Sequence, residues 1–353
     1  MACSHPDIRV RGVVMGLHDQ TVFISSYGQR EFEVVDSTYM RRGEFTFAMD
    51  EVYPDMYYVT FGENPARIPF IAERGEIDIN ADFDSGARIT VSGTPSNDLV
   101  TRYNSLDESY QARMDRLKTE LHAYKSASDT INYDRTETEI KNLESGNNNG
   151  FRNLIIENGS LAGAAYLLTT VDTYGYSVGQ MDSLLSLLSP ALRSNRFSDM
   201  LNSRRSALVR VSAGNPAPDF ALPLPESGLY TLSSARGSHV LLHFWASESE
   251  PSMAVMPALN RLYDRYKKDM TIISVSLDTD RVVWHDALSS IRMRWVNVSA
   301  MRGWSSDVVS SYGVAGIPHL ILIDAEGNIV HPFIPPSELE TVVSCAITPV
   351  AAE

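Results

Sequence analysis

Short runs of alternating or wholly apolar residues, separated by polar turns, fill the first part of the chain. A period of two is typical of strands with one buried face, and breakers such as Arg42-Gly43 and Ser92-Gly93 fall between or just after the runs. The pattern therefore predicts an all-β sandwich domain over residues 1–95. The expected strands lie at 8–15, 21–25, 32–35, 45–49, 56–61, 68–71, 77–79 and 89–91.

From residue 96 the period changes, and apolar residues recur every three or four positions between Leu99 and Tyr124. This spacing predicts a long amphipathic helix, followed by a second helical stretch that Gly146 and Gly150 interrupt. Further helices are expected at 154–168, 181–188 and 197–209. Residues 96–211 are thus predicted to form an α-helical region whose aromatic and leucine positions make its core.

A segment rich in small residues and proline, 212–218, indicates a joint between domains. Beyond it, predicted strands and helices alternate, which is typical of an α/β unit. We therefore expect an α/β domain over residues 212–353. Its strands are predicted at 240–245, 270–277, near Val296, 320–324 and 329–333, and its helices at 251–266, 282–291, 305–312 and from Ser337.

Composition excludes several classes of function. The 353 residues carry a formal net charge of −14, with Lys and Arg scattered among acids, so the chain has no basic stripe for nucleic acid. No apolar run reaches the length that a membrane-spanning helix needs. The two cysteines, Cys3 and Cys345, are too few for a disulfide framework or a cysteine-rich metal site.

The start of the chain, Met1-Ala2-Cys3-Ser4, resembles the end of a bacterial lipoprotein signal, in which a small residue precedes the cysteine that becomes acylated. Cys3 is therefore the candidate lipidation site, and such a lipid would be the chain's only membrane contact. This interpretation predicts a location in the cell envelope, periplasmic or lipid-anchored. The alternative is an ordinary thiol near the chain end.

Five segments of the C-terminal domain resemble a known family. They are residues 240–247, Met256-Pro257, 276–280, 312–319 and 322–327. In order and spacing they are similar to the thioredoxin-like (AhpC/TSA, thiol-disulfide oxidoreductase) envelope proteins of Bacteroidetes. Some of those proteins carry an N-terminal DUF4369-type domain, which residues 43–47 and 92–97 resemble. The resemblance implies a thioredoxin-like fold for residues 212–353.

In that family the turn before the first long helix of the domain reads Trp-Cys-x-Pro-Cys, whereas here it reads Glu248-Ser249-Glu250-Pro251-Ser252. Disulfide exchange needs a thiolate that attacks a disulfide sulfur, and a serine hydroxyl is not ionised at neutral pH. We therefore expect no catalytic residue at the degenerate positions Ser249 and Ser252. The resemblance also implies a cis Ile317–Pro318 bond and a groove for an extended peptide. The expected groove residues are Trp245, Glu248, Glu250, Pro251, Ile317 and Pro318.

The serines have a structural explanation, because Ser247 or Ser249 can cap the following helix, with Pro251 in its first turn. Three alternatives stay open. A serine could be a nucleophile with His319 or His243 as its base, although no nucleophile-elbow pattern is present. The cysteines could have been engineered to serine, although Glu248 and Val255 also depart from the family pattern. A partner could supply the thiol in trans.

Neither a cofactor nor a metal is predicted. His239 and His243 are four residues apart, which on a strand separates them by roughly 13 Å. Cys345 is expected on the last helix, away from the active-site turn. The leading hypothesis is a redox-inactive thioredoxin-fold envelope protein that binds an extended peptide or an envelope protein through the degenerate groove. The alternative is a thiol-disulfide oxidoreductase of the same family.

Overall fold

The computed structural model describes residues 7–27, 32–50, 54–62, 64–84, 88–192 and 195–347. The chain forms two compact units: one contains residues up to 171 together with 183–200, and the other contains residues 172–182 together with 201–353. Residues 172–182 and 201–211 of the predicted helical region therefore belong to the same unit as the C-terminal domain.

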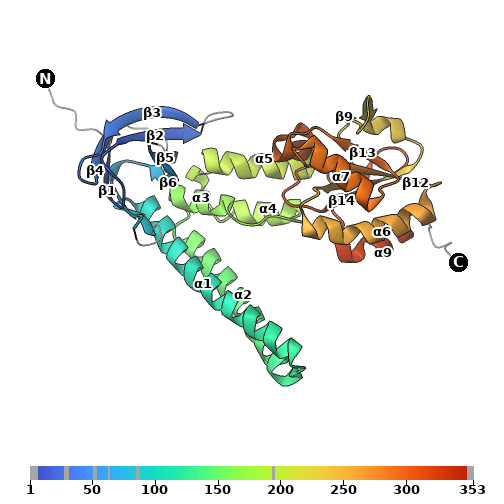
Figure 1. Cartoon of the computed structure of the whole chain (residues 1–353), viewed down its shortest axis with the longest axis horizontal. Helices are drawn as coiled ribbons and strands as arrows, with labels where there is room; N and C mark the ends of the chain where they lie inside the picture. Colours follow the sequence, from blue (N-terminus) through green and yellow to red (C-terminus); the bar gives the residue numbers. More distant parts are fainter. Residues whose placement is uncertain are drawn as a thin grey trace. The chain divides into compact units, whose positions relative to one another are not determined.

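Two four-stranded sheets form the N-terminal β domain (Figure 1). Their strand orders are β4-β1-β7-β8 and β3-β2-β5-β6. Strand β1 alternates buried and exposed residues along its length, which places its apolar side chains in a core shared with side chains such as Phe47 and Phe61. The strands are β1 (Ile8–Met15), β2 (Thr21–Tyr27), β3 (Phe32–Tyr39), β4 (Glu44–Met49), β5 (Asp55–Phe61), β6 (Asn64–Ala72), β7 (Gly75–Asp82) and β8 (Arg88–Ser92).

The helical region begins at Pro95, which occupies the first turn of α1 (Pro95–Ser126). Helix α2 (Thr130–Glu157) packs against α1, and Tyr103 and Phe151 meet edge to face at 5.3 Å between ring centroids. The predicted break in α2 at Gly146 and Gly150 is wrong, because α2 is continuous through both glycines. Packing against α1 outweighs the low helix propensity of the two residues. The shorter helices are α3 (Ala162–Thr169), α4 (Val178–Leu185), η1 (Pro190–Leu192) and α5 (Arg196–Arg210).

A five-stranded sheet of order β13-β12-β11-β14-β15 lies at the centre of the second unit. Strands β11, β12 and β13 are parallel, and β14 and β15 are antiparallel to their neighbours. β11 is buried on both faces, in agreement with its continuous apolar sequence. The strands are β11 (His239–Trp245), β12 (Met270–Ser276), β13 (Val296–Ser299), β14 (His319–Ile323) and β15 (Ile329–His331), with a separate pair β9 (Ala221–Pro223) and β10 (Leu229–Thr231).

Helices cover both faces of this sheet. Side chains of α6, α7 and α9 share one hydrophobic cluster with Leu241 and Trp245, and α8 contributes Val308 and Val309 to the other. Figure 1 shows α6 beside α9, and an ion pair from Arg261 joins the two helices. The elements are η2 (Leu232–Ala235), α6 (Glu250–Tyr266), α7 (Arg281–Ile291), η3 (Gly303–Ser305), α8 (Asp307–Ser311), η4 (Pro336–Glu338) and α9 (Leu339–Ile347). The predicted fold class, a β domain followed by a helical region and a thioredoxin-like α/β domain, is confirmed.

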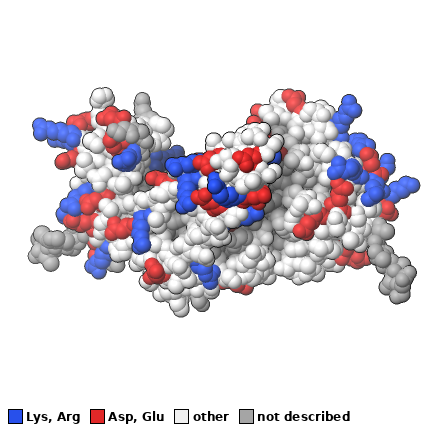
Figure 2. Space-filling model, turned by 90° about the horizontal axis from the view of Figure 1, so that it is seen from below, with Lys and Arg blue, Asp and Glu red and all other residues white. Residues whose placement is uncertain are grey.

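Charged side chains of both signs are interspersed on the face drawn in Figure 2. Ion pairs join oppositely charged side chains of the α1–α2 hairpin, such as Arg113 with Glu139 at 2.7 Å. No helix among the described residues combines the length and apolar content that crossing a bilayer requires. On the face drawn in Figure 2, acidic side chains lie between the basic ones.

His243 is a titratable residue in the core of the second unit. Its side chain is fully buried, and its Nδ1 lies 3.1 Å from the Ser274 hydroxyl, which also accepts a hydrogen bond from Trp295 Nε1 at 2.8 Å. Burial lowers the pKa of His243 to about 3 because the imidazolium would lose its hydration. The folded chain therefore keeps this ring neutral over the pH range in which an exposed histidine takes up a proton.

We predict that this burial makes the second unit lose stability as the pH falls below about 6.5. The unfolded histidine has a pKa near 6.5 and takes up a proton that the folded ring takes up only near pH 3, so His243 alone should lower the free energy of unfolding by about 2 kcal/mol between pH 7 and pH 5. Urea titrations followed by tryptophan fluorescence measure this unit alone, since all four tryptophans lie in it.

The variant His243→Phe should remove that contribution and flatten the pH dependence by the same amount. His239→Phe is the matched control, because His239 lies on the same strand and keeps contact with solvent. An unchanged slope in His243→Phe would contradict the assignment.

Candidate functional site

The candidate site lies at the end of the five-stranded sheet where the interior strand β11 ends and its neighbour β14 begins, here called the sheet edge. The two strands are antiparallel, and Phe244 pairs with His319, so the segment after Trp245 lies beside the segment before His319. The carboxyl ends of β12 and β13 reach the same edge, because both are parallel to β11. This arrangement brings the serine turn and the Ile317–Pro318 peptide to one edge of the sheet.

Ser249 caps the N-terminus of α6. Its hydroxyl oxygen accepts a hydrogen bond from the Ser252 N–H at 3.3 Å and another from the Ser252 hydroxyl at 3.0 Å. Ser252 is fully buried, Ser249 is half-buried, and Pro251 occupies the first turn of the helix. The two hydroxyls therefore satisfy each other and one of the open N–H groups of the helix, as expected for a polar cap.

Ser247 does not cap the helix but ties the turn to the neighbouring strand. Its N–H and its hydroxyl donate to Asp278 Oδ1 at 3.0 and 2.8 Å, and the Ser276 hydroxyl donates to Asp278 Oδ2 at 2.6 Å. Asp280 caps α7 by accepting from the Val282 N–H at 2.7 Å. The buried Asp278 carboxylate thus fixes the path of the chain between β11 and α6.

The Ile317–Pro318 peptide bond is cis, as predicted. The Pro318 carbonyl accepts a hydrogen bond of 2.5 Å from the Tyr174 hydroxyl, whose ring packs against Gly316. Within the described part of the chain, no hydrogen bond engages the main-chain N–H or C=O of Ile317. A half-buried residue with two unused main-chain groups in the loop before a strand can pair with an extended chain.

The predicted groove residues differ in exposure. Glu248, Glu250 and Pro251 are exposed beside Ser249. Trp245 departs from the prediction, because its side chain is fully buried in the cluster that also contains residues of α6, α7 and α9. Trp245 is the last residue of β11, and its side chain points into this cluster. It therefore packs beneath the sheet edge inside the core and offers no surface to a partner.

Neither histidine proposed as a general base contacts the serines among the hydrogen bonds of the described residues. His243 Nδ1 faces Ser274, and the His319 ring packs between Phe244 and Phe333. Burial lowers the pKa of His319 to about 4, with the nearby Arg204 charge adding to the effect and the Pro332 carbonyl opposing it. Neither His243 nor His319 is therefore placed to act as the base of a serine nucleophile.

Two residues of the site escaped the sequence analysis. Trp304 lies in η3 directly after β13, and 53% of its side chain is exposed. Tyr174 comes from the loop before α4, far from Pro318 in the sequence. An exposed tryptophan is an unusual surface residue. Trp304 follows β13, whose carboxyl end lies at the same end of the sheet as the carboxyl end of β11 because the two strands run parallel.

The cysteines lie elsewhere. Cys345 is exposed on α9, and Cys3 lies outside the described residues. Among the described residues, no group of three or more His, Cys, Asp or Glu side chains could hold a metal ion.

Comparison with known proteins identifies two domain families. A family described as thioredoxin-like matches residues 237–329, and a domain of unknown function, DUF4369, matches residues 8–100. The chain is 28% identical over 126 residues to the thiol-disulfide oxidoreductase ResA of Bacillus thuringiensis (strain Al Hakam), covering 35% of this chain and 71% of the relative. The same enzyme of Geobacillus kaustophilus is 29% identical over 120 residues, or 34% of this chain and 67% of the relative.

Solved structures were found for the same part of the chain. A thiol-disulfide oxidoreductase from Bacteroides fragilis is 30% identical, covering 37% of this chain and 98% of that chain with a TM-score of 0.35. A thiol:disulfide interchange protein from Bacteroides sp. is 27% identical, covering 40% of this chain and 93% of that chain with a TM-score of 0.38. From the family matches and the ResA relatives we conclude that the chain joins an N-terminal DUF4369 domain to a thioredoxin-like domain homologous to thiol-disulfide oxidoreductases.

Proposed function

We propose that this chain is a redox-inactive thioredoxin-fold protein that binds an extended peptide or an envelope protein at the sheet edge around Ser249, Ser252 and Ile317. The observation that carries the proposal is the pair of hydroxyls 3.0 Å apart at the start of α6. They stand where relatives of the resembled family carry the two thiols, and they complete a helix cap instead.

Chemistry supports the absence of redox turnover. Thiol-disulfide exchange passes through a mixed disulfide, which forms only when a thiolate attacks a disulfide sulfur. Oxygen at residues 249 and 252 cannot form that bond. Cys345 provides the exposed thiol of the described residues, but it lies on α9 and not in the turn between β11 and α6.

The remaining features support binding. Ile317 offers an unused N–H and C=O for main-chain pairing, and the exposed Glu248 and Glu250 give the neighbouring turn negative charge. Trp304 adds a large exposed aromatic side chain at the same edge, two strands from β11. Tryptophan is over-represented among the residues that carry most of the energy of protein interfaces.

Thiol-disulfide exchange is the second candidate function, and the names of the relatives favour it. It requires that serines replace natural cysteines at positions 249 and 252, or that a partner supplies the thiol. A location in the envelope, with a lipid on Cys3, remains part of the proposal and is supported by the residues around Cys3.

The redox proposal predicts that the chain fails to accelerate insulin reduction by dithiothreitol above the uncatalysed rate. The variant Ser249→Cys/Ser252→Cys should gain activity, because both thiols would lie in the first turn of α6, where a helix N-terminus favours the thiolate. Turbidity from precipitated insulin chains measures the rate.

Both chains should be tested in a Cys3→Ser/Cys345→Ser background, in which Ser249→Cys alone is the control that has a single thiol and cannot form an internal disulfide. Turnover by the unrestored chain would refute the proposal and favour the second candidate.

The structural role of the serine predicts that Ser249→Ala lowers the free energy of unfolding by about 1 kcal/mol, since one helix N–H loses its cap. Ser306→Ala is the matched control: Ser306 caps α8 without a side-chain hydrogen bond, so its loss should be smaller. Urea denaturation followed by tryptophan fluorescence compares them. Equal losses in the two variants would contradict the capping role.

The binding proposal predicts that the chain binds reduced, carboxymethylated α-lactalbumin, an extended chain without free thiols. Trp304→Ala should weaken this binding at least about tenfold, as expected when a large exposed aromatic side chain contributes to an interface. Tyr39→Ala is the control, since Tyr39 is equally exposed but lies in the β domain. Biolayer interferometry measures both affinities, and equal affinities for the two variants would rule out this edge as the binding surface.

A further inference from the structure

A pocket of about 440 Å³ lies on the other side of the β14 entry, within the second unit. It is separate from the serine turn, and Ser249, Ser252 and Ile317 do not line it. Its walls are mainly apolar, and their polar side-chain atoms come from the hydroxyls of Tyr176, Ser177 and Ser212 and from two nitrogen-bearing side chains, Arg204 and His319. The lining residues are Gly175, Tyr176, Ser177, Val178, Gly179, Arg204, Leu208, Ser212, Ala213, His319, Pro332 and Phe333.

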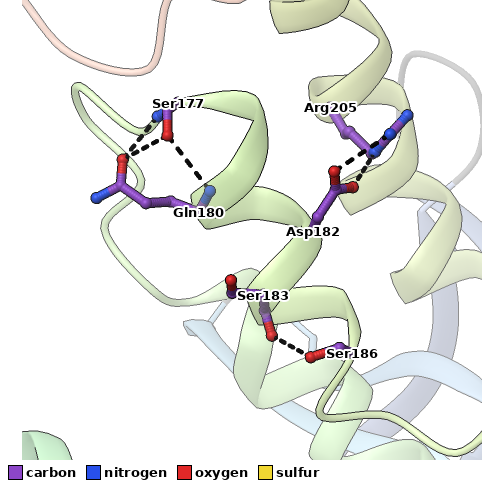
Figure 3. A network of polar contacts seen from close by, with 6 residues as sticks. All are labelled: Ser177, Gln180, Asp182, Ser183, Ser186 and Arg205. Carbon is purple, nitrogen blue, oxygen red and sulfur yellow. Dashed lines mark hydrogen bonds and ion pairs between the residues drawn. The ribbon is translucent and has the colours of Figure 1, made fainter.

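One wall is the start of α4, and hydrogen bonds hold it firmly. The Ser177 N–H and hydroxyl donate to Gln180 Oε1 at 2.8 and 2.9 Å, and the Gln180 N–H donates to the Ser177 hydroxyl at 3.3 Å, which forms a reciprocal capping box (Figure 3). An ion pair between Asp182 and Arg205 ties α4 to α5. The positive end of the α4 dipole is therefore fixed at the pocket.

The opposite wall is built from the end of the sheet. Phe333 packs against the His319 ring at 5.3 Å and against Tyr174 at 5.1 Å between ring centroids. Gly175 has a φ of +72°, and an added Cβ would lie 2.9 Å from the Phe333 ring. The loop before α4 can follow this path only with a glycine at that position.

Arg204 supplies a half-buried positive charge that forms no salt bridge, although the Asp172 carboxylate lies near enough to interact with it electrostatically. Its guanidinium donates to the Gly313 carbonyl at 2.7 Å and to the Thr173 carbonyl at 2.9 Å, and its Nε has no hydrogen-bond partner. No salt bridge among the described residues includes it. A partly buried guanidinium that is not in direct contact with an anion, and whose Nε lacks a hydrogen bond, can still gain interaction energy from a bound anion.

His319 is the second nitrogen-bearing side chain of the pocket, and only 4% of the residue is exposed. Neither ring nitrogen makes a hydrogen bond of good geometry. At neutral pH the low pKa of His319 keeps the ring uncharged, so it offers one N–H donor and one acceptor nitrogen. The pocket therefore contains a single full positive charge, that of Arg204.

We propose that this pocket is a binding site for a small organic monocarboxylate with an apolar body. The carboxylate would lie against Arg204, His319 and the start of α4, where one negative charge matches the one guanidinium. The apolar body would cover Leu208 and Phe333. A dianion such as inorganic phosphate fits less well, because the pocket supplies no second cation and its lining is largely apolar.

Isothermal titration calorimetry of the full chain tests the site with 4-phenylbutyrate as the probe and 4-phenylbutyramide as its uncharged counterpart. We expect a Kd below about 1 mM for the acid and at least tenfold weaker binding of the amide. A carboxylate could also come from the end of a peptide. The tripeptide Ala-Ala-Phe, with a free or an amidated C-terminus, distinguishes that source from a free acid.

Two variants locate the site. Gly179→Leu adds an apolar side chain at the pocket wall, where an added Cβ meets no atom within 4 Å, and should abolish binding while Arg204 stays in place. Gly150→Leu is the matched control, since that helical glycine also faces open space but lies in α2. Arg204→Gln should weaken the acid at least tenfold and leave the amide unchanged.

If Arg204→Gln fails to fold by tryptophan fluorescence, Gly179→Leu decides the question. Equal affinity for acid and amide, full binding by Gly179→Leu, or no heat with any carboxylate would overturn the proposal.

Discussion

The site depends on how the chain leaves β11 and enters α6. Ser249 satisfies the open N–H of Ser252 at the start of the helix, and Ser247 anchors the preceding turn to the buried carboxylate of Asp278. Both contacts use oxygen acceptors, and neither needs sulfur. The turn can therefore keep its shape when the thiols of the resembled family are replaced, because the hydroxyls take over the capping and the tether lies outside the replaced positions.

The Ile317–Pro318 peptide separates two surfaces of different character. On one side, Ile317 keeps its main-chain groups unused next to the serine turn. On the other side, Tyr174 occupies the Pro318 carbonyl, and Arg204 and His319 face a pocket that residues 172–182 and α5 complete. The thioredoxin-like domain alone supplies only part of these walls. Residues from the helical region thus line this pocket together with residues of the thioredoxin-like domain.

Local patterns predicted most of the fold. The period-two runs before residue 95 reappear as strands and the helical spacing after it reappears as helices, because each pattern reflects burial against one neighbour. The helix expected at 154–168 is instead divided between α2 and α3. The serine turn and the cis peptide bond were predicted from the family resemblance, because the residues around them match the motifs of that family in order and spacing. Predictions failed where distant packing decides: α2 continues through Gly146 because α1 supports it, and Trp245 turns inward because helices cover that face of the sheet. Contacts such as Tyr174 to Pro318 join residues 144 positions apart and leave no signal in sequence spacing.

In the proposed function, the sheet edge beside Ser249 binds an extended chain through the main-chain groups of Ile317 and without sulfur. Amide hydrogen exchange at Ile317, measured by NMR with and without saturating carboxymethylated α-lactalbumin, tests this most directly. The Ile317 amide should exchange freely in the isolated chain. Its exchange rate should fall at least about tenfold in the complex, because the amide then donates to the bound strand. Binding that leaves the Ile317 amide unprotected would contradict the proposed function.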